Sequence, residues 1–225
     1  MPASWRTGRP LLLAEMGAFV GLFAADAAGI IPLSKTPFLL VIAIASWRLR
    51  GVSQREIGFH AWRDWALTIV VGVAAGAAFE GIELFVSQPL LVAAFQEQPD
   101  LSIFHEVRGN WKLMLLLLAL AWTLAAWGEE LVYRGYLMNR VADLLPRGRV
   151  ATAFGLVVMS VAFGFAHGYQ GPVGVIDEGF MGLLLGLLYM VFGRSILIPV
   201  IAHGVQDSID VVLLYTGTYP MPQSG

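Results

Sequence analysis

The sequence predicts an all-α integral membrane protein, a polytopic bundle of about seven transmembrane helices (six to eight) in one membrane domain, 1–225. Of its 225 residues, 57% are apolar and only 13% are charged. Soluble globular domains have about 45–50% apolar and about 25% charged residues. Apolar runs of roughly 20 residues, the length that crosses a bilayer, recur along the chain. Glycine and proline interrupt several of them beside ionisable residues, which predicts broken helices around those residues.

The same composition excludes several classes of function. The formal net charge is −2, which argues against a nucleic-acid-binding protein. The chain contains no cysteine, so disulfides, thiolate metal sites and a cysteine nucleophile are excluded.

Each element follows from local patterns, taken in chain order. Glu15 interrupts the first apolar run, but several further runs follow, so a transmembrane helix is preferred to a cleaved signal peptide. After the second run, basic and aromatic residues interleave over 48–64, which is typical of an interfacial segment. Residues 96–110 are polar and are expected to form a loop, and Pro146 begins a turn. The expected spans are 10–28, 29–48, 65–93, 111–140, 150–168, 177–193 and 195–215.

Lysine and arginine are unevenly distributed between the two ends of these spans, and basic residues favour the cytoplasmic side of a membrane. Ten against three predicts a cytoplasmic N-terminus. One end receives Arg6, Arg9, Arg48, Arg50, Arg55, Arg63, Arg140, Arg147, Arg149 and Arg194. The other end receives Lys35, Arg108 and Lys112.

Ionisable residues within apolar spans indicate function, because each costs several kcal/mol unless it is paired or hydrated. Glu130 and Arg134 are four residues apart, so a helix places them on one face as an ion pair. Glu129 is rotated by about 100° from Glu130. One acid is thus expected to be held by arginine, while the other is available to a water or a ligand.

Two further pairs have the same spacing. Phe163 and His167 share a helix face, as do His203 and Asp207. The third span carries Glu80 and Glu83, for which a position on the loop side of a short helix is the preferred interpretation.

Each group taken alone also has a structural explanation. The Glu130–Arg134 pair could be a boundary ion pair, and an intramembrane histidine is more often a packing residue than a ligand. The combination of two glutamates, two histidines and an aspartate on three of these spans is harder to explain as packing.

The ordered motifs Glu129-Glu130-x-x-x-Arg134, Phe163-x-x-x-His167 and His203-x-x-x-Asp207 resemble the CPBP family. This is the CAAX prenyl protease and bacteriocin-processing family, also called Abi. The resemblance covers residues 111–212 and implies a membrane-embedded endopeptidase. It implies that Glu129 and His167 activate a water molecule, and that His203 and position 207 stabilise the oxyanion. Glu130, Arg134 and Phe163 would support this site.

Position 207 departs from the pattern, since the family often has asparagine there. An ionised carboxylate would repel an oxyanion. Asp207 would then be protonated, orient His203 or bind a cation. Glu129, His167, His203 and Asp207 also form a plausible Zn²⁺ ligand set, so two alternatives stay open for the cofactor, Zn²⁺ or none.

The main hypothesis is therefore an intramembrane endopeptidase of CAAX-protease type, acting on a peptide or protein substrate in the lipid bilayer. The alternatives are a proton- or cation-coupled transporter using Glu80, Glu83, Glu129 and Glu130, and a non-catalytic scaffold. The substrate and the oligomeric state are left open. The endopeptidase requires that Glu129, His167 and His203 converge beside aromatic residues such as Phe163, Trp127 and Tyr133. It also predicts a non-helical stretch over 168–174.

Overall fold

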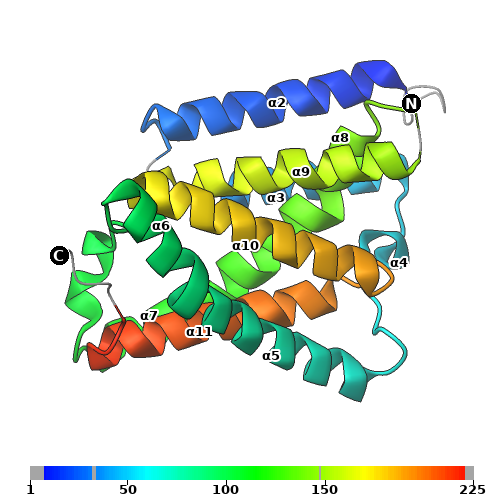
Figure 1. Cartoon of the computed structure of the whole chain (residues 1–225). Coiled ribbons are helices and arrows are strands. Elements are labelled where there is room, and N and C mark those ends of the chain that lie inside the picture. The colour runs from blue at the N-terminus through cyan, green and yellow to red at the C-terminus, as the bar shows by residue number, and fades with distance from the viewer. Residues whose placement is uncertain (1–7, 32–33, 147, 221–225) are drawn as a thin grey trace.

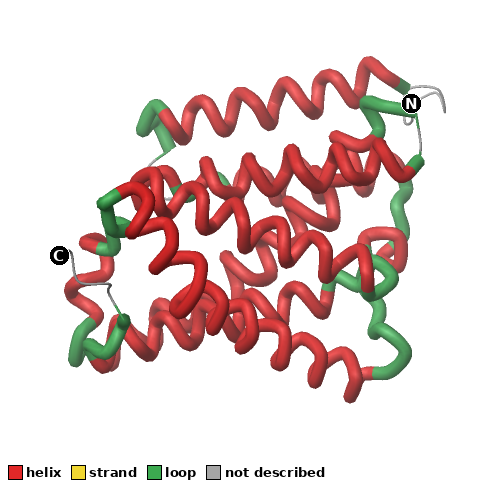
Figure 2. Tube along the Cα trace, in the orientation of Figure 1, coloured by secondary structure: helices red, strands yellow, loops and turns green. Residues whose placement is uncertain are grey.

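The computed structural model describes residues 8–31, 34–146 and 148–220, and all regular structure in these ranges is helical (Figure 2). This confirms the all-α fold. The elements, in chain order, are α2 (Arg9–Ala27), α3 (Thr36–Arg50), α4 (Gln54–Ile57), α5 (Trp65–Ile82), the π-helix η1 (Glu83–Ser87), α6 (Gln88–Phe95), the 3₁₀-helix η2 (Ser102–Val107), α7 (Trp111–Leu120), the π-helices η3 (Ala121–Glu129) and η4 (Leu131–Leu137), α8 (Met138–Ala142), α9 (Arg149–Ala166), the 3₁₀-helix η5 (Gly168–Gln170), α10 (Gly171–Val191) and α11 (Leu197–Thr216).

Six helical stretches in the described part of the chain are long and apolar enough to cross a membrane. They show a multi-pass membrane protein. The second expected span, 29–48, corresponds to α3, which has 15 residues. At 1.5 Å per residue this helix is about 22 Å long, short of the ~30 Å hydrocarbon core of a bilayer. Its N-terminus begins only at Thr36 because Pro37 occupies the first turn.

The helices are broken, but mainly at positions that the sequence did not indicate. The third span continues from α5 through η1 to α6, and the fourth runs from α7 through η3 and η4 to α8. A π-helical turn inserts an extra residue and rotates the side chains that follow it, and such turns are frequent at functional sites. The acidic motif lies where η3 meets η4.

The expected non-helical stretch over 168–174 is only partly correct. Gly168–Gln170 forms a single 3₁₀ turn, and Gly171 begins α10, so the rest of that stretch is helical. Pro172 is compatible with this position, because the first turn of a helix leaves its N–H groups unpaired in any case. α10 therefore begins six residues before the expected start at 177.

Small residues allow close helix packing around the site. A Cβ atom at Gly76 would collide with the backbone of α11, and one at Gly164 would collide with α10. Close approach through glycine is typical of membrane helix pairs, since lipid tails are as apolar as the helices. These contacts fix α11 against α5 and α10 against α9.

The two ends of the bundle differ in charge. One end of the bundle is formed by the start of α2, the end of α3 and the whole of α4 (Figure 1). The starts of α5, α9 and α11 lie at the same end. This end contains the arginine-rich loops that the sequence assigned to one side. The opposite end contains η2, η5 and the C-terminal end of α11 (Figure 1). Arg6 and Arg147 lie outside the described residues.

Candidate active site

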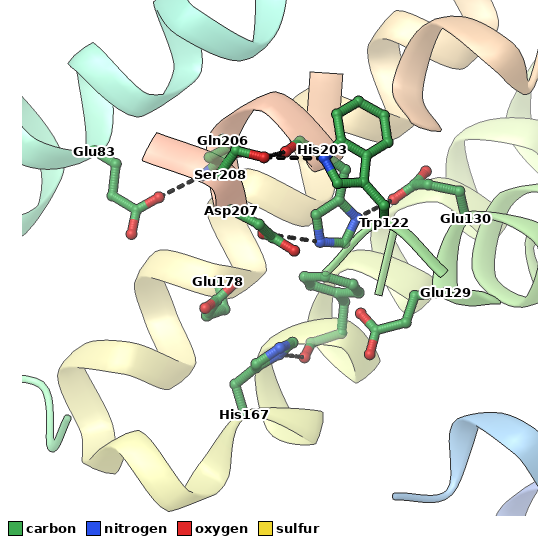
Figure 3. A network of polar contacts seen from close by, with 12 residues as sticks. Glu83, Trp122, Glu129, Glu130, His167, Glu178, His203, Gln206, Asp207 and Ser208 are labelled. Atoms are coloured by element: carbon green, nitrogen blue, oxygen red, sulfur yellow. Dashed lines mark hydrogen bonds and ion pairs between the residues drawn. The ribbon is translucent and has the colours of Figure 1, made fainter. Parts of the chain in front are cut away.

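The structure brings four predicted site residues to one cavity. Glu129 at the end of η3, His167 after α9, and His203 and Asp207 on α11 line a cavity of about 270 Å³. Figure 3 shows these side chains reaching the same region from different helices. A water molecule occupies ~30 Å³ in the liquid, so the cavity has room for water together with part of a peptide.

Glu130 is fully buried and connects two helices. Its Oε1 accepts a hydrogen bond from Arg134 Nη1 at 2.6 Å and another from His203 Nδ1 at 3.0 Å. Arg134 also donates through Nη2 to the carbonyl oxygen of Gly182 on α10, at 2.8 Å. The ion pair expected from the i, i+4 spacing is therefore formed. The contact of Glu130 with His203 joins the junction of η3 and η4 to α11, which helical spacing does not predict.

The hydrogen bonds of the two histidines define the role of each nitrogen. His167 Nδ1 lies 2.9 Å from the carbonyl oxygen of Phe163, which can only accept. Nδ1 therefore carries a proton, and in the neutral tautomer Nε2 presents a lone pair as an acceptor. His203 Nδ1 donates to Glu130, while its Nε2 lies 3.5 Å from Asp207 Oδ1.

Phe163 is buried between both histidines and the arginine. Its ring centroid lies 4.8 Å from that of His167 and 6.0 Å from that of His203. The guanidinium carbon of Arg134 lies 4.8 Å from the ring centroid of Phe163, within the range of a cation–π contact. Phe163 thus fixes the positions of charged and polar neighbours by packing.

Only one of the two carboxylate oxygens of Glu129 accepts a hydrogen bond from the described residues. Thr36 on α3 donates a long hydrogen bond of 3.4 Å to its Oε1. Its Oε2 is buried and accepts no hydrogen bond from the described residues. Thr36 was not indicated by the sequence motifs, because it lies 93 residues away and on another helix.

The aromatic lining differs from the expectation. Neither Trp127 nor Tyr133 lines the cavity. Trp127 stacks on Phe59, with ring centroids 6.0 Å apart, and Tyr133 packs edge-on against Phe163. The aromatic residues that do line the cavity are Phe104, Tyr169 and Tyr219. The π-helical turns rotate this part of the chain, so the face of each residue cannot be counted from a regular 3.6-residue period.

The interpretation of Glu80 and Glu83 as loop-side residues is wrong, since both are buried. Glu83 accepts hydrogen bonds from Gln206 at 2.5 Å and from Gln88 at 3.1 Å, and it lines the cavity. The cavity also contains Glu178 and Asp210, which the sequence motifs missed. A signal for Asp210 was present, because it follows Asp207 by three residues on one helix face.

Tyr219 lies beyond the last helix and closes one side of the cavity. Its hydroxyl accepts a hydrogen bond of 2.9 Å from Gln88. Burial, with smaller contributions from the charges of Asp210 and Glu83, raises the pKa of Tyr219. The phenol therefore stays protonated.

The described residues show no assembled metal site at the four proposed Zn²⁺ ligands, so this ligand set stays a prediction. Among the described residues, no group of three or more His, Cys, Asp or Glu side chains is arranged to hold a metal ion.

Comparison with protein families gives a match to the model described as Type II CAAX prenyl endopeptidase Rce1-like, over residues 110–209. Comparisons with curated proteins and with solved structures found no match. The matched range contains the three motifs that suggested the CPBP resemblance, and it nearly coincides with the expected core, 111–212. The match implies a CAAX-type intramembrane protease, which favours the endopeptidase over the transporter. Residues 110–209 of this chain thus match the Rce1-like domain of the CAAX prenyl endopeptidase (CPBP) family.

Proposed function

We propose that the chain is an intramembrane endopeptidase in which Glu129 and His167 activate a water molecule for attack on a peptide carbonyl. The observation that carries this proposal is the presence of two acceptors in the lining of one cavity. Glu129 Oε2 lacks a partner among the described residues, and His167 presents Nε2 as an acceptor because its Nδ1 is bound to Phe163. A water molecule has two protons to donate, one to each of these acceptors.

His203 supports the other half of the reaction. As an imidazolium it donates Nδ1–H to Glu130. Its Nε2–H has only a long contact of 3.5 Å with Asp207 Oδ1, so it can turn to the oxyanion that forms when the water oxygen bonds to the carbonyl carbon. Glu129 then transfers the proton taken from the water to the leaving nitrogen as the C–N bond breaks. Asp207 orients His203 from the next helical turn.

Natural substrates provide the most direct test. Membranes containing the unaltered chain and membranes containing Glu129→Ala are compared by quantitative proteomics for uncleaved precursors and their products. An endopeptidase gives precursors that accumulate only with the variant. Identical peptide profiles would contradict the proposal.

Substitution of Asp207 by asparagine should be tolerated. The amide keeps an oxygen that accepts from His203 and adds N–H donors for the oxyanion, so turnover should stay within about tenfold of the unaltered chain. Asp207→Leu removes both functions and should reduce turnover by about 10²–10³-fold, the usual cost of a lost oxyanion-hole group. Equal losses in Asp207→Asn and Asp207→Leu would show that the negative charge itself is required.

We also propose that the arginine-rich end is cytoplasmic, which places the cavity end on the opposite side. The chain contains no cysteine, so single cysteines can report sidedness. Ser102→Cys, exposed at the cavity end, should react with a membrane-impermeant maleimide in intact cells. Arg55→Cys, exposed at the arginine-rich end, should react only after permeabilisation. The reverse pattern would invert the orientation.

A further inference from the structure

One wall of the cavity is formed by carboxylates that the proposed reaction does not use. Glu83, Glu178 and Asp210 line it from η1, α10 and α11, beside Asp207 and Glu129. Figure 3 shows Glu83, Glu178 and Asp207 coming from three different helices. Among the described residues that line the cavity, none is lysine or arginine. The cavity is therefore rich in carboxyl groups and in hydrogen-bond acceptors.

The remainder of the lining is largely aliphatic. Leu117, Leu120 and Leu124 contribute from α7 and η3, and Leu214 contributes from α11. The cavity thus combines an apolar surface with an acidic one, and an apolar ligand alone would leave the acidic surface without a partner. Buried polar groups without partners are costly, so the ligand is expected to supply donors.

The side-chain amides of Gln88 and Gln206 provide a second observation about the ligand of this wall. Gln88 and Gln206 donate to the two oxygens of Glu83, which fixes the orientation of both amides because a carboxylate only accepts. Gln88 lines the cavity and is only 4% exposed, yet its Oε1 is buried and accepts no hydrogen bond from the described residues. Asp210 Oδ1 is also buried without a partner among the described residues, while the Asp210 carboxyl group shares a hydrogen bond with Glu80. Both atoms are acceptors that the described residues leave unsatisfied, and a group with several donors would satisfy more than one of them.

We propose that this wall is a subsite for a cationic side chain, arginine or lysine, of the peptide substrate. The inference rests on the proposed endopeptidase function and specifies its substrate class: a basic residue next to apolar ones. A guanidinium or ammonium group brings several donors and a positive charge, so it satisfies the vacant oxygens and the carboxylates together. Because Asp207 contacts His203 and Asp210 is one helical turn further, the basic residue lies within about three residues of the cleaved bond.

Binding and cleavage are measured separately to test this subsite. The probe is a Leu/Ala-rich synthetic peptide with one arginine, and its partner has citrulline at that position, which keeps the shape and removes the charge. Equilibrium binding is measured with Glu129→Gln protein in lipid nanodiscs, and cleavage is measured with the unaltered chain. The arginine peptide should bind at least about tenfold more tightly than the citrulline peptide, as expected for charge-assisted hydrogen bonds.

The second arm alters the protein. Glu178 is partly exposed and lies outside the proposed catalytic set, so the Glu178→Gln protein should fold and should still bind the citrulline peptide. The preference of this variant for the arginine peptide over the citrulline peptide should fall by about tenfold or more. Glu106→Gln, which removes an exposed carboxylate away from the cavity, should keep the full preference. Equal binding of both peptides would overturn the subsite even if both are cleaved. A preference for arginine in the binding assay would support the subsite even if neither peptide is cleaved, and the endopeptidase function would then fail by itself.

Discussion

Glu129→Gln is expected to reduce peptide cleavage by about 10²–10⁴-fold, the usual contribution of a general base, while the protein folds normally. Glutamine has nearly the same shape as glutamate, and its oxygen still accepts the long hydrogen bond from Thr36. The amide cannot take a proton from the bound water at neutral pH, so only the chemical step is lost. Initial rates on a membrane peptide and thermal unfolding in detergent micelles measure the two quantities.

A matched control is Glu97→Gln, which removes an exposed carboxylate from the loop between α6 and η2. It should change neither the rate nor the unfolding temperature. Cleavage by Glu129→Gln at the rate of the control would refute the role of Glu129 as the base. A large fall in the unfolding temperature of Glu129→Gln would instead assign Glu129 to the structure.

Glu130→Gln is expected to cost stability and activity together. Glu130 is completely buried and is the ion-pair partner of Arg134, which is itself 3% exposed. Removing one charge of a buried pair leaves the other uncompensated, which destabilises proteins by about 3–5 kcal/mol. Activity also falls, because Glu130 holds Nδ1 of His203. Chemical or thermal unfolding in micelles, together with initial rates, measures both effects.

The double variant Glu130→Leu/Arg134→Met separates the two effects. Replacing both charges by apolar groups removes the uncompensated charge, so the double variant should be more stable than either single one. It should still be inactive, since His203 has lost the acceptor that orients it. Recovery of activity along with stability would show that Glu130 acts only through folding.

The sequence by itself was sufficient for the class of the protein and for the local part of its site. Apolar runs of bilayer length predicted the helical membrane fold, because only a helix or a closed barrel satisfies the backbone in lipid. The i, i+4 spacing predicted the ion pair between Glu130 and Arg134, since both residues belong to one helical turn. The three motifs together indicated the family, and the match over 110–209 agrees.

Only the tertiary structure decided which groups face one another across helices. The contact of His203 with Glu130 joins residues 73 positions apart, and Thr36 reaches Glu129 from a helix outside the matched range. Hydropathy does not predict such contacts, because a lipid-facing helix surface and a helix-facing one are equally apolar in a membrane. The rotation of each helix is set instead by glycine contacts such as Gly76 against α11 and by the π-helical turns. These features turned Trp127 away from the cavity and brought the acidic residues of three helices to one wall.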